Sequence, residues 1–88
     1  MIVDTDFLRA VLELGDEQEA ARLFNDLFTP AELADLTLRW KLLKDLHRGM
    51  TQRKIAEKYG ISLCKITRGS KVLKKDGSVA LKLLDSRN

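Results

Sequence analysis

The chain has 88 residues and a mass of 10.0 kDa, the size of one small domain, which leaves no room for a second core of ordinary size. A hydrophobic content of 44% and a charged content of 33% are typical of a globular protein and exclude a disordered tail or a fibrous repeat. The formal net charge of +3 conceals an uneven distribution. Residues 1–40 carry three basic and nine acidic side chains (net −6), whereas residues 41–88 carry thirteen basic and four acidic ones (net +9). The strong positive charge of residues 41–88 indicates a polyanionic partner.

The composition also excludes several classes of protein. No apolar run approaches the roughly 18 residues of a membrane-spanning helix, and Asp4 and Asp6 lie where a signal peptide would be basic, so we expect a cytoplasmic protein that does not contact a membrane. The single cysteine, Cys64, and the single histidine, His47, provide neither a disulfide nor a zinc cluster. We therefore expect no metal, no prosthetic cofactor and no enzymatic activity.

Two short helices are predicted at the start of the chain. Residues 5–14 place apolar side chains at helical spacing and stop at Gly15, a residue suited to a left-handed helix end. Asp16 is a suitable N-cap for a second helix over 17–28, and Glu19, three residues later, completes the capping pattern.

The segment TPAE at 29–32 predicts the start of a long helix. Thr29 offers a capping hydroxyl, Pro30 takes the first helical position, and Glu32 is placed to bond back to the cap. The helix is expected to run to about Arg48 and to close at Gly49. Its predicted stripe along one side consists of Leu33, Leu36, Trp40, Leu43 and His47.

Three further helices are predicted in the second half, each after a hydroxyl side chain suited to an N-cap. They are residues 52–59 after Thr51, 63–75 after Ser62, and 79–86 after Ser78. No segment shows the alternation of a half-buried strand. The predicted fold class is therefore all-α, with about six short helices.

The helices over 52–59 and 63–75 have the spacing of a helix-turn-helix, in which the second helix enters the DNA major groove. Ala56 is small enough to let the two helices approach, and Gly60 tolerates the left-handed turn between them. The apolar positions predicted to be buried are Ile55, Ile61 and Ile66.

Charge supports DNA binding over a helical hairpin used only for packing. Basic residues of the two helices and their ends include Arg53, Lys54, Lys65, Arg68, Lys71, Lys74 and Lys75. The acidic residues there are Glu57 and, at the edge, Asp76, whereas a merely solvated surface mixes both signs.

Contacts to DNA are assigned by position. The residues predicted to face base edges, at the start of the second helix, are Ser62, Leu63, Cys64, Lys65 and Thr67. Gln52 and Arg53 are predicted to bind phosphates at the positive end of the first helix. The residues predicted to add electrostatic attraction farther along are Lys71, Lys74 and Lys75, and Arg68 is also predicted to bind DNA.

These residues belong to a stretch that resembles the tryptophan repressor family and its shorter relatives. The resemblance covers most of the chain from about residue 20, and its most specific segments are LFTPAE at 27–32, LRW at 38–40, RGMTQRKIA at 48–56 and ITRGS at 66–70. It implies an intertwined all-helical homodimer of one domain, 1–88. The parts that it implies are dimerisation helices in 1–48, a DNA-reading head in 51–75 and a C-terminal helix in 76–88.

The resemblance also implies a corepressor pocket. In the family two arginines, matched here by Arg39 and Arg68, hold the ligand, the main chain near Thr29 receives its amino group, and the glycine matched by Gly69 lines the pocket. A glycine at that position needs a physical explanation, since glycine inside a helix costs about 1 kcal/mol relative to alanine.

These residues do not single out one ligand. Lys65 stands where the repressor has a pocket threonine, and Val72 where it has a serine, so tryptophan is one candidate among small molecules. The alternative is that Arg39 and Arg68 are structural or phosphate-binding arginines.

The sequence thus predicts a homodimeric regulator, a repressor in the family, that binds a palindromic operator in double-stranded DNA. The alternative from another class is a helical assembly module whose basic face binds an acidic protein. An RNA-binding domain is disfavoured because no aromatic residues accompany the basic cluster for base stacking.

Overall fold

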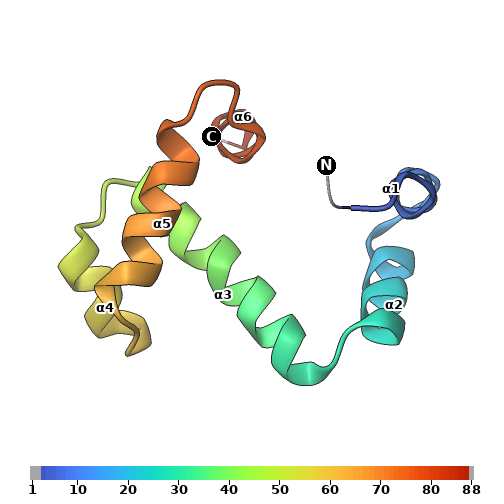
Figure 1. Ribbon diagram of the computed structural model, residues 1–88, viewed down its shortest axis with the longest axis horizontal. Helices are drawn as coiled ribbons and strands as arrows, with labels where there is room; N and C mark the ends of the chain where they lie inside the picture. The colour runs from blue at the N-terminus through green and yellow to red at the C-terminus, as the bar shows by residue number, and fades with distance from the viewer. Residues whose placement is uncertain (1–2, 88) are drawn as a thin grey trace. The chain divides into compact units, whose positions relative to one another are not determined.

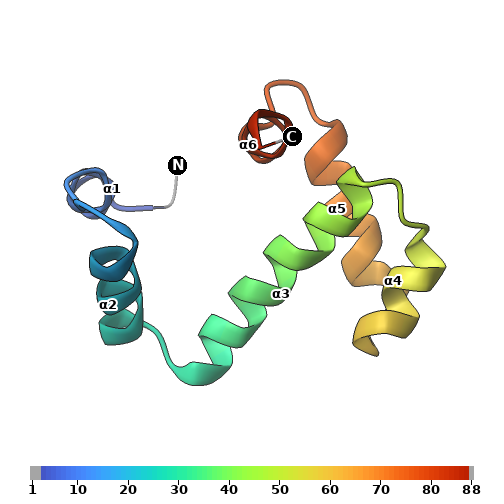
Figure 2. The same ribbon diagram turned by 180° about the vertical axis from the view of Figure 1, so that it is seen from behind.

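The computed structural model describes residues 3–87 and shows six α-helices, with no β-strand in that range (Figure 1 and Figure 2). They are α1 (Thr5–Leu12), α2 (Glu17–Leu27), α3 (Pro30–His47), α4 (Gln52–Tyr59), α5 (Leu63–Lys74) and α6 (Val79–Ser86). None of these helices is long and apolar enough to cross a membrane. The all-α prediction is confirmed. The chain divides into two compact units, Met1–Ala34 and Asp35–Asn88, with the boundary inside α3.

Helix α1 begins at a side-chain cap and ends earlier than its sequence pattern predicts. The Asp4 carboxylate accepts a 3.0 Å hydrogen bond from the Phe7 amide, which satisfies a free N–H group of the first turn. The helix ends at Leu12, and Glu13 stays in the right-handed conformation with its amide bonded to carbonyls of the preceding turn. The predicted end at Gly15 is wrong, because the chain leaves the helix without a left-handed residue there.

Helices α2 and α3 begin at the predicted caps. Asp16 Oδ1 accepts a 2.9 Å hydrogen bond from the Glu19 amide. At α3 the Glu32 amide donates to Thr29 Oγ1 at 3.2 Å, and the Thr29 amide donates to Glu32 Oε1 at 2.9 Å. This reciprocal pair is a capping box, and Pro30 follows the cap at a position where its missing N–H breaks no bond.

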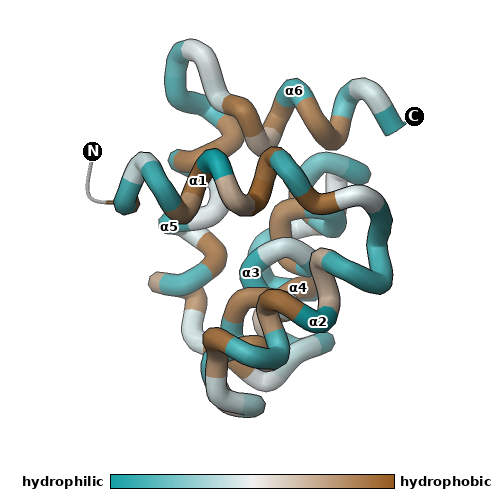
Figure 3. The backbone as a smooth tube through the Cα atoms, turned by 90° about the vertical axis from the view of Figure 1, so that its right-hand side faces the viewer, coloured by the Kyte–Doolittle hydropathy of each residue, from teal (hydrophilic) through white to brown (hydrophobic). Residues whose placement is uncertain are grey.

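Helices α1 and α2 carry apolar surface that the described chain leaves uncovered. Neither helix has a buried residue within the described range. Apolar and polar residues alternate along both helices in short stretches (Figure 3), and the exposed fractions of Leu12 and Leu27 are 84% and 54%. Large apolar side chains with this degree of exposure are typical of a surface that packs against another element.

The core of the second unit lies where α3, α4 and α5 meet (Figure 1). Leu42, Ile55 and Ile66, one from each helix, are buried. The partly buried residues packed around them are Leu43, Leu46, Met50, Ala56, Tyr59 and Ile61. The predicted burial of Ile55 and Ile66 is confirmed, and Ile61 is half-buried.

The face of α3 that packs on this core differs from the predicted stripe. Leu43 belongs to that stripe and packs against the core. Leu42, which is part of the core, and Leu46, which packs against it, do not belong to the stripe. Trp40 and His47 instead line a hollow beside α6. The prediction was wrong because apolar residues lie on several sides of α3, so their spacing does not single out one face.

The helix-turn-helix has the predicted turn. Thr51 Oγ1 accepts a 3.2 Å hydrogen bond from the Lys54 amide at the start of α4. Gly60 ends α4 in the left-handed conformation, with φ 63° and ψ 40°, and the Ile61 amide bonds back to the Ala56 carbonyl at 3.2 Å. A side-chain hydrogen bond thus defines the start of α4, and a backbone hydrogen bond defines its end.

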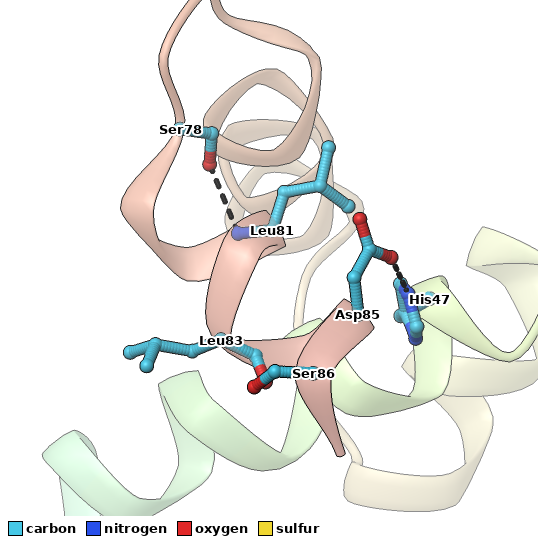
Figure 4. Close-up of polar contacts among 6 residues, drawn as sticks. All are labelled: His47, Ser78, Leu81, Leu83, Asp85 and Ser86. Atoms are coloured by element: carbon cyan, nitrogen blue, oxygen red, sulfur yellow. Dashed lines mark hydrogen bonds and ion pairs between the residues drawn. The ribbon is translucent and has the colours of Figure 1, made fainter. Parts of the chain in front are cut away.

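A polar contact joins helix α6 to the end of α3 (Figure 4), and one leucine of α6 is buried. Leu84 is 3% exposed. His47 Nε2 on α3 lies 2.8 Å from Asp85 Oδ1 on α6, and Ser78 Oγ caps α6 by accepting a 3.2 Å bond from the Leu81 amide. The last predicted helix is therefore part of the second unit.

The structure gives a packing reason for the glycine within α5. A Cβ atom on Gly69 would lie 2.5 Å from Leu42 Cδ1 and 3.3 Å from Leu43 Cδ2, both on α3. Real Cβ atoms do not approach a side chain that closely, so a glycine at this position lets α5 pass close to α3.

We predict that Gly69→Ala destabilises the protein although alanine is the better helix former. Overpacking costs about 1–3 kcal/mol, whereas the helix preference returns about 1 kcal/mol, so the free energy of unfolding in urea should fall by about 1 kcal/mol. In a Leu42→Ala background, where the clashing methyl group is absent, the same substitution should be close to neutral. An equal loss in both backgrounds would contradict this account.

Candidate nucleic-acid interface and ligand cavity

Helix α5 presents two adjacent faces with different surroundings. Residues three or four apart share one face of a helix. One face, with Lys65, Gly69 and Val72, lines a cavity beside α3. The other lines an exposed groove, formed by Leu63, Cys64, Thr67, Arg68 and Lys71. Arg68 lies at the border and lines both the cavity and the groove.

The exposed groove contains three of the residues predicted to reach base edges: Leu63, Cys64 and Thr67. Leu63 is 53% exposed, and Cys64 is an exposed free thiol. Ser62 precedes them at the cap of α5, where its side chain makes no capping hydrogen bond. These side chains therefore lie together at the start of α5, where a groove-reading helix contacts DNA.

A hydrogen bond joins the two helices of the motif at their predicted DNA contacts. The Thr67 hydroxyl donates to Gln52 Oε1 at 3.2 Å. This bond occupies the amide oxygen of Gln52 and leaves its NH2 group as a donor. Arg53 is exposed beside it in the first turn of α4, where free N–H groups and the helix dipole favour an anion.

Seven of the eight basic residues of the motif and its ends have no acidic partner within the described part of the chain. None of the seven forms an ion pair with a residue in the range 3–87, and all are exposed: Arg53, Lys54, Lys65, Arg68, Lys71, Lys74 and Lys75. Lys58, by contrast, is held by Asp45 on α3. The charges on this surface are therefore free to neutralise an external polyanion.

The cavity between α3 and α5 has a volume of about 430 Å³, within the usual range for small-molecule sites. Its apolar lining residues are Leu38, Leu42, Leu43, Gly69 and Val72. Its charged lining residues are Asp35, Arg39, Lys65 and Arg68. Arg39 Nη2 lies 2.9 Å from Asp35 Oδ2, and both side chains are partly exposed.

The structure brings together most of the predicted ligand residues. Those that line the cavity are Arg39, Arg68 and Gly69. Thr29 lies in the first unit, where it caps α3. Lys65, predicted to face base edges, lies on the cavity side of α5. Asp35 was not predicted, although its spacing of four residues from Arg39 is the signal of a helical ion pair.

A buried carboxylate joins α3 to α4. Asp45 is 2% exposed, and its Oδ2 accepts hydrogen bonds from the Tyr59 hydroxyl at 2.6 Å and from Lys58 Nζ at 3.1 Å. Arg48 Nη1 lies 3.7 Å from Oδ1. Sequence analysis missed this network because an aspartate in a charged helix is usually exposed, and its partners lie in another helix.

The network has an electrostatic consequence. Burial by itself raises the pKa of the Asp45 carboxyl, but the hydrogen bonds from Tyr59 and Lys58 and the charges of Lys58 and Arg48 outweigh burial and lower the pKa below its ordinary value of 3.8. The hydrogen bond to Asp45 correspondingly raises the pKa of Tyr59 and of Lys58. A lowered pKa stabilises the fold above about pH 4, and this stabilisation is lost as the pH falls further.

Two short helices, a left-handed turn and an unpaired basic surface on the second helix define a DNA-binding regulator of the helix-turn-helix class. The model of the Trp repressor protein family matches residues 5–86. The chain therefore belongs to the Trp repressor family, which consists of repressor-type transcriptional regulators, and the resemblance seen in its motifs is confirmed.

Individual relatives agree with this assignment. A Trp operon repressor homolog from Chlamydia trachomatis serovar D is 39% identical over 71 residues, which cover 75% of this chain and 76% of the relative. A homolog of the same name from Vibrio campbellii is 40% identical over 60 residues, covering 67% and 60%. One from Chlamydia caviae is 38% identical over 68 residues, covering 72% and 67%. No solved structure matches the chain.

We predict that Asp45→Asn lowers the free energy of unfolding at pH 7 by about 1–3 kcal/mol, because a buried charge-assisted hydrogen bond is lost. The difference from the parent protein should shrink as the pH falls below about 4, where the parent carboxylate itself becomes protonated. Urea titrations between pH 7 and pH 3 measure both effects. Asp35→Asn, in a partly exposed ion pair, is the control and should cost at most about 1 kcal/mol. Equal costs for both substitutions would contradict the special role of Asp45.

Proposed function

We propose that this protein is a sequence-specific DNA-binding repressor in which α5 enters the major groove. The observation that carries the proposal is the set of seven exposed basic side chains, without ion-pair partners in the described range, on a motif of groove-reading geometry. Within α4 and α5 the single acidic residue is Glu57. The protein acts in the cytoplasm and has no enzymatic activity of its own.

The contacts divide into positioning and reading. Gln52 and Arg53 bind phosphate at the start of α4, while Thr67 both holds the Gln52 amide and lies in the reading groove. Leu63 and Cys64 offer apolar contact to a thymine methyl group. The side chains farther along α5 contribute attraction without reading sequence.

The protein binds DNA as a homodimer. Leu12, Leu27 and Leu36 are 84%, 54% and 44% exposed in the single chain, and a second copy would cover such apolar surface. Two reading heads about 34 Å apart then fit successive major grooves of a palindromic operator, whose symmetry matches that of the dimer.

A small-molecule corepressor in the cavity of α3 and α5 controls the heads. A ligand that contacts both helices favours those head positions that fit the operator spacing. The relatives are homologs of a Trp operon repressor, which makes L-tryptophan the first molecule to test.

We predict that selection from random duplex DNA, with and without L-tryptophan, enriches a palindrome. Thr67→Ala should change the preferred bases, because Thr67 lies in the reading groove. Lys74→Ala, at an exposed lysine that does not line this groove, should instead weaken binding to all sequences alike and reduce the slope of log K against log salt by about 0.9.

Failure to enrich any palindrome would overturn specific DNA recognition and favour a helical assembly module with a basic face. An unchanged base preference in Thr67→Ala would contradict the assignment of the groove. Enrichment that ignores L-tryptophan would remove that molecule as the corepressor and leave DNA recognition standing.

We predict that Leu12→Asp weakens the dimer by at least about tenfold, because a charge would be buried without a partner in the interface. Sedimentation equilibrium measures the dissociation constant. The matched control is Leu63→Asp, an exposed leucine in the reading groove, which should leave the dimer intact and weaken DNA binding. A dimer unaffected by Leu12→Asp would exclude α1 from the interface.

A further inference from the structure

The hollow beside α6 is separate from the sites described above. It has a volume of about 250 Å³ and shares no lining residue with the cavity beside α5 or with the reading groove. Its lining residues are Trp40, Lys44, His47 and Arg48 from the last turns of α3 and the residue after it, and Leu84 and Arg87 from α6 and its C-cap. Because two helices line the hollow, a molecule bound there would contact both α3 and α6.

The described lining of the hollow is strongly basic. It contains three cations, Lys44, Arg48 and Arg87, together with His47, and no acidic residue. Lys44 is half-buried and forms no ion pair with any residue in the range 3–87. Arg87 also lacks an acidic partner in that range, and its Cζ atom lies over the Trp40 ring, 5.9 Å from the ring centroid. Two cations thus remain unpaired at one small site.

Two carboxylates near these cations already have partners. Asp85 Oδ1 lies 2.8 Å from His47 Nε2 (Figure 4). Asp45 Oδ1 lies 3.7 Å from Arg48 Nη1, but the shorter hydrogen bonds of this carboxylate run to α4. Neither carboxylate forms an ion pair with the two unpaired cations, so a net positive charge remains at the hollow.

The apolar residues of the hollow strengthen its attraction for an anion. Leu84 is buried and Trp40 is half-buried, and the attraction between two charges grows where such side chains displace water. A guanidinium group offers phosphate a planar fork of donors, and an ammonium group offers it a compact charge. A singly charged anion would neutralise one of the two unpaired cations. The hollow therefore favours an anion with two or more charges.

We propose that this hollow binds a small multivalent oxyanion of the phosphate class, with Lys44 on α3 and Arg87 at the end of α6 as its principal ligands. The anion would join these helices beside the contact between His47 and Asp85. The proposal does not rest on the proposed function, since no residue of the hollow lines the reading groove. A free phosphate and the DNA backbone offer the same chemistry, so the test includes both.

Trp40 is the single tryptophan of the chain, so its fluorescence reports on this hollow. The experiment titrates pyrophosphate into the full chain at constant ionic strength, with acetate as the singly charged comparison, and repeats both titrations by calorimetry. We expect pyrophosphate to bind with a dissociation constant of about 0.1–1 mM and acetate to bind at least about tenfold more weakly. The affinity for pyrophosphate should fall as sodium chloride is added.

Substitutions identify the residues that hold the anion. Lys44→Met and Arg87→Met each remove one unpaired cation and should weaken pyrophosphate about five- to tenfold. They lie on different helices, so a folding defect in one variant leaves the other as the test. Lys41→Met removes an exposed lysine of α3 that does not line the hollow. It is the matched control and should change the affinity by less than about twofold.

Four outcomes would overturn the proposal. The first is equal binding of pyrophosphate and acetate, and the second is an equal loss in Lys41→Met and Lys44→Met. The third is no binding, as expected if a second copy covers the hollow or if its cations only stabilise the carbonyl end of α3. The fourth is a response of Trp40 to duplex DNA but not to pyrophosphate, which would assign the hollow to the DNA surface. Selection of palindromes from random DNA does not depend on these results, so either hypothesis can fail alone.

Discussion

The close approach of α5 to α3 at Gly69 is the contact on which the second unit depends. A Cβ atom there would lie 2.5 Å from Leu42 Cδ1, so any larger residue at this position requires the Leu42 side chain or the helices to shift. The approach lets Leu42 reach Ile55 and Ile66, which are fully covered. Gly69 and Leu42 also line the cavity, so one packing constraint shapes both the core and the cavity. Any ligand there touches the contact that orients the reading helix.

Polar contacts hold the other helices of this unit to α3. Asp45 binds Tyr59 and Lys58 of α4, and His47 binds Asp85 of α6. Polar contacts thus join α4 and α6 to α3, while α5 meets α3 at Gly69 and also packs against α4 and α6. Because α4 and α5 carry the proposed DNA contacts, the orientation of the basic surface depends on the packing of these helices against each other and against α3. The apolar surface left on α1 and α2 is separate from this attachment and suits a second chain.

Much of the fold follows from local signals in the sequence. Thr29 and Glu32 form the predicted capping box, Gly60 takes the predicted left-handed turn, and Ile55 and Ile66 are buried as their spacing indicates. The errors have a common cause. Gly15 permits a left-handed helix end but does not require one. The leucines of α3 lie on several sides, so no periodicity selects Leu42, and the burial of Asp45 depends on Tyr59, a residue in another helix.

By itself the sequence determined the six helices, the N-caps Asp16, Thr29, Thr51 and Ser78, the turn of the motif and the charge split between the two halves, because each depends on residues within about one helical turn or on composition alone. The tertiary structure decided which face of α3 is buried. It also gives the reason for the glycine in α5 and shows on which side of α5 each cation lies. It places Lys65 beside the cavity and Lys71 in the groove. A helical wheel places the two lysines on different sides of α5, but only the position of α3 decides which of those sides lines the cavity.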